Sequence, residues 1–223
     1  MVIDFRASAF KHALAVEDMH ERGLYRNGGK RLFETILVLM AAPICLPLVL
    51  VLALLIALDG HNPFFVQLRI GRNGRVFRIW KLRTMVKNAQ SQLEDHLAQD
   101  PEAREQWQRT QKLKQDPRIT RLGRFLRKTS VDELPQLLNV VNGTMALIGP
   151  RPMMVDQRHL YVGQTYRRLR PGITGLWQIS ARNESEFVAR VRYDDEYYRT
   201  LSLRTDLRIL ARTVLVVLRG TGY

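Results

Sequence analysis

The sequence is poor in cysteine and contains none of the glycine-rich loops that common nucleotide folds use to bind phosphate. Cys45 is the single cysteine among 223 residues, and it lies in an apolar run. This scarcity excludes a disulfide framework and a cysteine-rich zinc site, and it predicts a reducing, cytoplasmic environment for the folded part. Neither GxxxxGK[ST] nor GxGxxG occurs, and the histidines do not have the spacing of metal ligands.

Acidic residues are also scarce compared with basic ones. Lys and Arg number 35 against 21 Asp and Glu, which gives a formal net charge of +14. A chain this basic attracts polyanions, and the candidates are nucleic acid, an anionic membrane leaflet and a phosphorylated substrate. Because no nucleic-acid-binding motif is present, nucleic acid is not expected as a partner. The length suits one well-buried core and a single catalytic domain.

A long run without charge, residues 36–58, is the strongest sign of a membrane segment. At roughly 1.5 Å per residue it is long enough to cross a bilayer as a helix, and it lies too far into the chain for a cleavable signal peptide. Pro43 and Pro47 predict a kink. Basic residues on both flanks predict a re-entrant segment that returns to the cytoplasmic face, and an ordinary spanning helix is the alternative. These flanking residues are Lys30, Arg31, Arg69, Arg72, Arg75 and Arg78.

Two adjacent carboxylates, Asp132 and Glu133, follow a strongly basic stretch and precede a rigid Gly149–Pro152 corner that carries Arg151. Carboxylates can hold a divalent cation, and guanidinium groups can hold phosphate oxygens, so the pattern predicts phosphate chemistry. A solvated helix turn is the alternative for the acidic pair. The basic residues before the pair are Arg118, Arg121, Arg124, Arg127 and Lys128.

Alternating residues and two turn glycines predict a short β-hairpin over residues 67–84. Lys81 and Arg83 would then lie on one strand face and point to a phosphate, unless they are two solvated cations. The hairpin therefore supplies two candidate binding residues.

Three helical regions follow from the sequence pattern. Residues 88–115 predict a polar helical hairpin that restarts at Asp100, a good N-cap residue. Residues 118–127 carry an apolar and an arginine stripe, as in a helix at a membrane surface or one packed on a core. Residues 207–218 form a broad apolar face that would suit a membrane surface and packing on a core equally well. The apolar residues of the last helix are Leu207, Leu210, Ala211, Val214, Val217 and Leu218.

Several motifs occur in a fixed order from about residue 30 to the C-terminus. They are KRLFE, RIGRNGRVFRIWKLRTM, DPRITRLGRFLRKTSVDELPQLLNV, IGPRP, RPGITGLWQISAR and the region 193–207. In these motifs the chain resembles the monotopic bacterial phosphoglycosyl transferases, or bacterial sugar transferases. Members move a sugar 1-phosphate from a nucleotide diphosphate sugar to polyprenyl phosphate. The chain is most similar to the short members that start exopolysaccharide repeats with galactose or glucose 1-phosphate.

The resemblance implies a mostly helical α+β fold that is monotopic in the membrane. Residues 1–29 would form a cytoplasmic tail, residues 30–60 a re-entrant helix hairpin, and residues 61–223 the catalytic domain. Amphipathic interfacial helices would surround that small domain. The implied location is the cytoplasmic face of the bacterial inner membrane, where anionic lipid is a further partner.

The resemblance also implies a catalytic Asp132–Glu133 dyad that holds Mg²⁺, and a phosphate-binding Arg151. Asp132 would attack the sugar-bearing phosphorus of a UDP-sugar and carry the phosphosugar covalently until polyprenyl phosphate takes it. Two alternatives remain. A direct metal-assisted displacement uses the same acids without a covalent step, and a non-enzymatic basic membrane adaptor would bind anionic lipid or RNA.

Further substrate contacts are expected from Lys81, Arg83, Asp194 and Tyr197. The expected donor is a UDP-sugar, and the expected acceptor is undecaprenyl phosphate or another polyprenyl phosphate. The chain could also pair as a homodimer.

Overall fold

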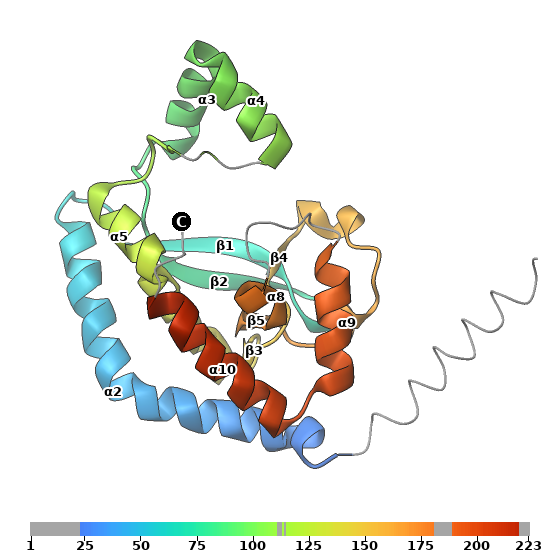
Figure 1. The fold of residues 1–223 in the computed structure, drawn as a ribbon. Helices are drawn as coiled ribbons and strands as arrows, with labels where there is room; N and C mark the ends of the chain where they lie inside the picture. Colours follow the sequence, from blue (N-terminus) through green and yellow to red (C-terminus); the bar gives the residue numbers. More distant parts are fainter. Residues whose placement is uncertain (1–22, 111–112, 114, 181–188, 219–223) are drawn as a thin grey trace, which may run out of the picture. The chain divides into compact units, whose positions relative to one another are not determined.

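The computed structural model describes residues 23–110, 113, 115–180 and 189–218 (Figure 1). Most of the predicted tail, residues 1–29, lies outside this part of the chain. Helices predominate over short strands, which confirms the mostly helical α+β class. The contacts divide the chain into two compact units. The first unit comprises residues up to Ala42, Leu68–Phe77 and Leu137–Thr213, and the second comprises Pro43–Gln67, Arg78–Gln136 and the residues from Val214 onward.

The charge-free run forms one long helix, α2 (Lys30–Ala57), which follows a short π-helical segment, η1 (Tyr25–Gly29). Pro43 and Pro47 both lie inside α2. The helix is long and apolar enough to cross a membrane, and many of its large apolar side chains are exposed; Met40 and Ile44, for example, are 71% and 75% exposed. A re-entrant path through the membrane stays a prediction.

The predicted hairpin is confirmed by strands β1 (Phe64–Ile70) and β2 (Val76–Leu82), which belong to a three-stranded sheet in the order β2-β1-β4 (Figure 1). A short 3₁₀ turn, η2 (Arg72–Gly74), joins them, and Asn73 and Gly74 have φ angles of 59° and 75° in it. These left-handed conformations suit Asn and Gly. Strand β4 (Met153–Met154) pairs antiparallel with β1, where Arg69 is opposite Met154.

A second, two-stranded sheet lies in the first unit and carries the Gly149–Pro152 corner. Strands β3 (Ala146–Ile148) and β5 (Gly172–Thr174) are parallel, with Ala146 opposite Gly172. A Cβ atom at Gly172 would lie 2.1 Å from the Gly149 nitrogen, so these two backbones can approach only because glycine has no side chain.

Shorter elements complete the first unit and flank the Gly149–Pro152 corner along the chain. Along the chain they are α6 (Leu137–Val141), η4 (Asp156–Leu160), α7 (Thr165–Arg168) and α8 (Leu176–Ser180). The corner thus lies between β3 and β4, while α8 follows β5 directly.

The core of the first unit is formed by Ile148, Leu169, Tyr197 and Ile209. Two helices contribute to it, α9 (Arg190–Thr200) and α10 (Leu203–Leu218). The apolar face predicted for the last helix is not the face that is buried. Asp206 and Ile209 are 0% and 1% exposed, whereas of the predicted face only Leu210 packs partly against the core among the residues whose burial is described. Its exposed residues include Leu207, Val214 and Val217.

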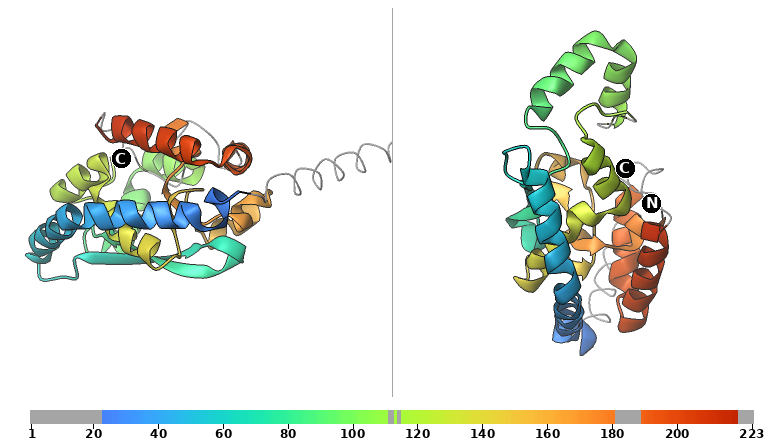
Figure 2. Two further views of the ribbon diagram at one scale, coloured as in Figure 1. Left: turned by 90° about the horizontal axis from the view of Figure 1, so that it is seen from below. Right: turned by 90° about the vertical axis from the view of Figure 1, so that its left-hand side faces the viewer.

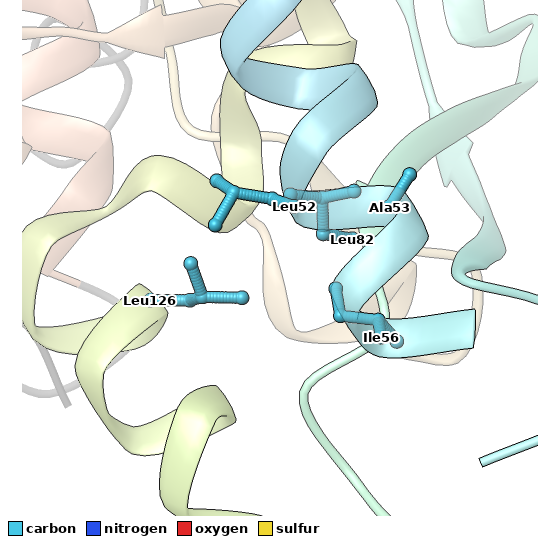
Figure 3. Packing of buried hydrophobic residues seen from close by; sticks show 5 residues of the cluster. All are labelled: Leu52, Ala53, Ile56, Leu82 and Leu126. Atoms are coloured by element: carbon cyan, nitrogen blue, oxygen red, sulfur yellow. The ribbon is translucent and has the colours of Figure 1, made fainter. Parts of the chain in front are cut away.

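The core of the second unit joins the end of α2, strand β2 and helix α5 (Arg121–Thr129) (Figure 3). Leu126 of α5 is fully buried there, while its neighbour Phe125 is 59% exposed. The helix predicted over residues 118–127 therefore packs on a core through one face and leaves an aromatic side chain exposed. The buried members are Leu52, Ala53, Ile56, Leu82 and Leu126.

The predicted polar hairpin is confirmed by α3 (Ala89–Gln99) and α4 (Pro101–Thr110), which lie side by side (Figures 1 and 2). A small cluster of Leu93, Ala103 and Leu113 holds them. Asp100 accepts a hydrogen bond of 2.9 Å from the Ala103 backbone nitrogen. It therefore caps the second helix as predicted.

Helix α5 lies very close to the backbone at the end of β2. Thr120 caps the helix by accepting a hydrogen bond of 2.9 Å from the Gly123 nitrogen, and its own nitrogen donates to the Thr84 carbonyl oxygen at 3.0 Å. A Cβ atom at Gly123 would lie 2.0 Å from that same oxygen. Gly123 is thus required for packing, although glycine is a poor helix former.

We predict that Gly123→Ala destabilises the protein by about 1–3 kcal/mol, because the added methyl group forces helix α5 away from Thr84. The thermal unfolding midpoint of the purified protein measures the change. Gly23→Ala is the matched control, since a Cβ atom there would meet no heavy atom within 4 Å. Equal midpoints for the two variants would contradict the close approach.

Candidate functional site

A left-handed residue at the end of α5 directs the chain into the segment that carries the acidic pair. Ser130 has a φ angle of 57°, and its nitrogen donates to the Arg127 carbonyl oxygen at 3.1 Å. The next six residues form a 3₁₀ helix, η3 (Val131–Gln136), with Asp132 and Glu133 in its first turn. Negative side chains are favoured at this end of a helix, where free backbone N–H groups carry partial positive charge.

The structure brings Lys81 of β2 to both acids, a contact that the hairpin pattern did not predict, and a phosphate contact by Lys81 stays a prediction. The Lys81 Nζ atom lies 2.7 Å from Glu133 Oε1 and 4.0 Å from Asp132 Oδ2. Asp132 is only 7% exposed. Asp132 is therefore buried and Glu133 half-buried, and both lie beside a cation, so the pair is not a solvated helix turn.

Burial is the main reason why the pKa of Asp132 rises to about 6. Lys81 and Arg127 oppose the rise with their positive charges, and the negative charge of Glu133 adds to it. At neutral pH the Asp132 carboxylate is largely ionised, yet it is more basic than a carboxylate in water. Those two properties suit an attacking nucleophile.

The basic stretch before the acids does not act on them as a group. Arg118 instead forms a two-point ion pair with Asp116, through nitrogens at 2.8 and 2.7 Å. Arg127 donates to the Thr84 hydroxyl at 2.9 Å, and its charge lowers the pKa of Asp132. The other cations of the stretch are exposed, namely Arg121, Arg124 and Lys128.

Arg83, the second candidate of the hairpin, lies just after β2 and binds the chain segment that follows α2. Its Nη1 and Nη2 atoms lie 2.8 and 2.6 Å from the two carboxylate oxygens of Asp59. Its Nε atom also donates to the Asn62 carbonyl oxygen at 2.9 Å, and Nη2 donates to the Ile56 carbonyl oxygen at 3.2 Å. These contacts hold the end of α2 and the segment after it against the residue that follows β2, and a phosphate contact by Arg83 stays a prediction.

In the first unit, Arg151 lies beside an aromatic side chain that also contacts a second arginine. The Arg151 guanidinium carbon is 5.9 Å from the centre of the Trp177 ring, and that of Arg190 is 4.4 Å from it. Arg69 donates to the Pro152 carbonyl oxygen at 3.3 Å. The sequence patterns pointed to Arg151, whereas Arg190 was missed because it belongs to no local motif.

Asp194 lies in the same neighbourhood, at the end of a hydrogen bond from Tyr161. The Tyr161 hydroxyl donates to Asp194 Oδ2 at 2.8 Å. Burial raises the pKa of Asp194 to about 7, while that hydrogen bond and the charge of Arg190 oppose the rise. The pKa of Arg190 is lowered to about 10, mainly by burial and also by the charge of Arg151. The structure therefore places Asp194 among the arginines of the first unit.

Tyr197, the other candidate on α9, is only 2% exposed. Its hydroxyl lies 2.8 Å from Asp206 Oδ1 and 3.3 Å from the Ile148 carbonyl oxygen. These contacts belong to a buried hydrogen-bond network that holds α9, α10 and β3. A role of Tyr197 in substrate binding stays a prediction.

The carboxylate oxygens of the acidic pair are the kind of ligand that a divalent cation such as Mg²⁺ takes. No group of three His, Cys, Asp or Glu side chains converges within the described residues. Mg²⁺ in phosphoryl-transfer sites often needs only one or two carboxylates, because water and substrate phosphates complete its coordination. The Lys81 ammonium already lies within 4.0 Å of both Asp132 and Glu133, so the two carboxylates can share one cation.

Comparison with known proteins gives these residues a family context. A sequence profile described as bacterial sugar transferase matches residues 25–220. A protein of Erwinia amylovora named UDP-galactose-lipid carrier transferase is 45% identical over 195 residues, which cover 86% of this chain and 41% of that protein. The undecaprenyl-phosphate galactose phosphotransferase of Salmonella typhimurium is 44% identical over 195 residues, with the same coverage.

A shorter relative is matched over nearly its whole length. The exopolysaccharide production protein ExoY of Sinorhizobium fredii is 42% identical over 196 residues, which cover 86% of this chain and 87% of that protein. By contrast, the chain spans about two fifths of the length of the Erwinia and Salmonella relatives. Because the family profile extends over both units, including the acidic pair and the Arg151 corner, the chain belongs to the bacterial sugar transferase family.

Proposed function

We propose that this chain transfers a sugar 1-phosphate, galactose or glucose 1-phosphate, from a UDP-sugar to undecaprenyl phosphate with release of UMP. The reaction would be the first membrane step of exopolysaccharide or other glycoconjugate assembly. The names of the Salmonella and Sinorhizobium relatives support this substrate class. The observation that carries the proposal is the buried Asp132 with Glu133 beside it, both close to the Lys81 ammonium group.

In the first step, an Asp132 carboxylate oxygen attacks the sugar-bearing phosphorus of the donor. A phosphorus–oxygen bond to Asp132 forms, and the bond from that phosphorus to the bridging oxygen breaks, so that UMP leaves with the electron pair. The raised pKa of Asp132 favours this role, because basicity accompanies nucleophilic strength while the carboxylate stays ionised near neutral pH.

In the second step, a phosphate oxygen of undecaprenyl phosphate attacks the same phosphorus. The bond to Asp132 breaks, which restores the carboxylate and yields a lipid-linked diphosphate sugar. Lys81 lies 4.0 Å from Asp132, where its charge stabilises the carboxylate as it is released. Arg151 would bind the donor diphosphate in the first step through its planar guanidinium.

Mg²⁺ is part of the proposal, with Asp132 and Glu133 as its protein ligands. When bound, it would neutralise charge on the donor diphosphate. Lys81 would keep the two carboxylates close together until the donor arrives, since its ammonium group lies within 4.0 Å of both.

We also place the protein at the cytoplasmic face of the bacterial inner membrane, with α2 as a re-entrant segment. The support is the length and apolar composition of α2, its exposed apolar side chains and its basic flanks. A direct displacement without a covalent intermediate, or a non-enzymatic adaptor bound to anionic lipid, would use the same location. Catalytic experiments separate these alternatives.

The covalent step predicts a trapped intermediate. Incubation with radiolabelled UDP-galactose or UDP-glucose and Mg²⁺, without any acceptor, should leave labelled sugar phosphate on the protein. Asp132→Asn should abolish the adduct, because an amide oxygen is a far weaker nucleophile. Glu133→Gln should reduce it and raise the Mg²⁺ concentration that is required.

Asp95→Asn, at an exposed position, is the matched control and should label like the unmodified protein. An adduct that survives in Asp132→Asn would contradict the proposed nucleophile. UMP release that requires both substrates together would instead favour direct displacement, and no UMP release with any UDP-sugar would favour the adaptor.

Lys81 should set the pH at which Asp132 becomes active. Since the pKa of Asp132 is about 6, adduct formation at fixed Mg²⁺ should rise with pH through that value. Lys81 lowers the pKa of Asp132, so Lys81→Met should move the rise to higher pH by about one unit. Lys87→Met, at an exposed position, should leave the profile unchanged. A shift to lower pH would show that the sign of the coupling is wrong.

The re-entrant path of α2 predicts that both of its flanks face the cytoplasm. In a Cys45→Ser background, Leu24→Cys and Arg75→Cys should resist a membrane-impermeant thiol reagent in spheroplasts and react after permeabilisation. Both positions are exposed, so protection would reflect the membrane and not burial in the protein. Labelling of Leu24→Cys alone in spheroplasts would indicate a spanning helix.

A further inference from the structure

Three arginines from distant parts of the chain gather beside the start of the apolar helix, and the proposed reaction uses none of them. Arg31 lies in the first turn of α2, Arg72 in the η2 turn between β1 and β2, and Arg170 two residues before β5. All three belong to the first unit. They are called the arginine triad below.

The two-stranded sheet brings Arg31 and Arg170 to the same edge. A Cβ atom at Gly143 would lie 3.0 Å from Nη2 of Arg31, so the Arg31 guanidinium group packs on this turn glycine. Strand β3 begins three residues later at Ala146, whose backbone nitrogen donates to the Pro171 carbonyl oxygen at 2.8 Å. Arg170 directly precedes Pro171, and it therefore lies beside the turn on which Arg31 packs.

Arg72 reaches the same place from the hairpin turn. The η2 turn packs against α7, which ends two residues before Arg170. Burial lowers the pKa of Arg170, and the positive charges of Arg72 and Arg31 lower it further. The three guanidinium groups are thus close enough to repel one another, which is unfavourable without a counter-charge.

The acid that acts on Arg170 is already engaged elsewhere. Glu34 opposes the lowering of the Arg170 pKa, but its carboxylate is buried, and it accepts hydrogen bonds from the Lys30 ammonium group and the Ile148 backbone nitrogen. Within the part of the chain that the structure describes, no carboxylate forms an ion pair with the triad. The positive charge of the triad is therefore available to an external anion.

An exposed apolar stripe starts next to Arg31 on the same helix. Leu32, Ile36 and Met40 are 64%, 47% and 71% exposed, and their spacing of four residues places them on one face of α2. An anion held at the triad could extend an apolar chain along this stripe. The combination of positive charge and apolar surface fits an amphipathic ligand with a negative headgroup.

We propose that the arginine triad binds the phosphate headgroup of an anionic membrane phospholipid, whose acyl chains lie along the stripe of Leu32, Ile36 and Met40. Guanidinium groups suit a phosphate because their planar N–H donors match its oxygens. The same three charges repel the ammonium group of a zwitterionic lipid, so the site selects for net negative charge. The inference rests on the membrane location proposed for α2 and not on the transfer reaction.

Lipid binding to the full-length protein in detergent, measured by native mass spectrometry, tests the site. The lipid probes are dioleoylphosphatidylglycerol and dioleoylphosphatidylcholine, which share their acyl chains, and the unmodified protein should bind the first at least about tenfold more tightly. The double variant Arg31→Gln/Arg72→Gln should lose this preference and bind dioleoylphosphatidylcholine as before. Arg31→Lys/Arg72→Lys should lie in between, because it keeps the charge and loses the planar fork.

Arg192→Gln/Arg199→Gln is the matched control, since it removes the same charge from two exposed positions on α9. Arg31 and Arg72 are also exposed, so the melting temperature in lipid-free detergent should stay the same in both double variants. If Arg31→Gln/Arg72→Gln fails to fold, the lysine pair decides the question. A lost preference for dioleoylphosphatidylglycerol in the triad variant, with the control unchanged, supports the site.

Two soluble or shorter probes separate the lipid headgroup from other phosphates. If glycerol 3-phosphate binds the triad as tightly as dioleoylphosphatidylglycerol does, the site takes a free phosphate and the acyl chains add nothing, which overturns the proposal. A loss confined to farnesyl phosphate, a short polyprenyl phosphate, would assign the triad to the acceptor of the proposed reaction and overturn it too.

Two results with the lipids themselves would also contradict the site. These are equal binding of both lipids to the unmodified protein, and an equal loss in Arg192→Gln/Arg199→Gln, which would mean that only overall charge matters. If either is found in a protein that releases UMP and whose α2 flanks face the cytoplasm, the lipid site alone is rejected, and the proposed function and location stand.

Discussion

The fully buried carboxylate of Asp206 is the interaction on which the first unit depends. It accepts hydrogen bonds from the Tyr25 hydroxyl at 2.7 Å, the Lys30 ammonium at 2.7 Å and the Tyr197 hydroxyl at 2.8 Å. A carboxylate with 0% exposure needs such partners, because an unpaired buried charge costs several kcal/mol. The requirement fixes η1 and the start of α2 against α9 and α10.

The same network reaches the corner that carries Arg151. Lys30 also contacts Glu34 at 2.5 Å, and Glu34 in turn accepts a hydrogen bond of 3.0 Å from the backbone nitrogen of Ile148. Ile148 ends β3, and the Gly149–Pro152 corner follows it directly. A chain of charge-assisted hydrogen bonds therefore links the base of the apolar helix to the strand that positions Arg151. The helix proposed to enter the membrane and the proposed phosphate site share one rigid support.

Local sequence patterns predicted the local structure well. The turn glycines predicted the β1–β2 hairpin, Asp100 predicted the start of α4, and the acidic pair itself was visible as a motif. Contacts between distant residues could not be predicted in this way. Lys30 and Asp206 are 176 positions apart, and a single sequence contains no signal that pairs them. Lys81 and Glu133 are 52 positions apart. Each was a candidate site residue because of a different local pattern, and neither pattern indicated that the two side chains meet.

The buried face of α10 shows why an apolar pattern alone can mislead. The apolar stripe fits a core or a membrane surface equally well by its pattern, and the structure decides against a fully buried stripe, because the helix buries Asp206 and Ile209 and exposes Leu207 and Val214. In a soluble protein, an exposed apolar stripe of this kind would be an unfavourable surface. Beside a lipid surface it is the stable arrangement, since the apolar stripe can face acyl chains while the polar network stays inside.

The electrostatics of the acidic pair show that net charge does not decide the pKa of an individual group. The chain carries a formal charge of +14, yet the pKa of Asp132 rises to about 6 because burial outweighs the nearby cations. Arg118, which the sequence placed beside the pair, is neutralised by Asp116. If all the neighbouring arginines had pointed at Asp132, its pKa would fall and its nucleophilic strength with it. Lys81 and Arg127 do act on Asp132, but burial outweighs both cations, so the pKa of its carboxyl group stays above the ordinary value.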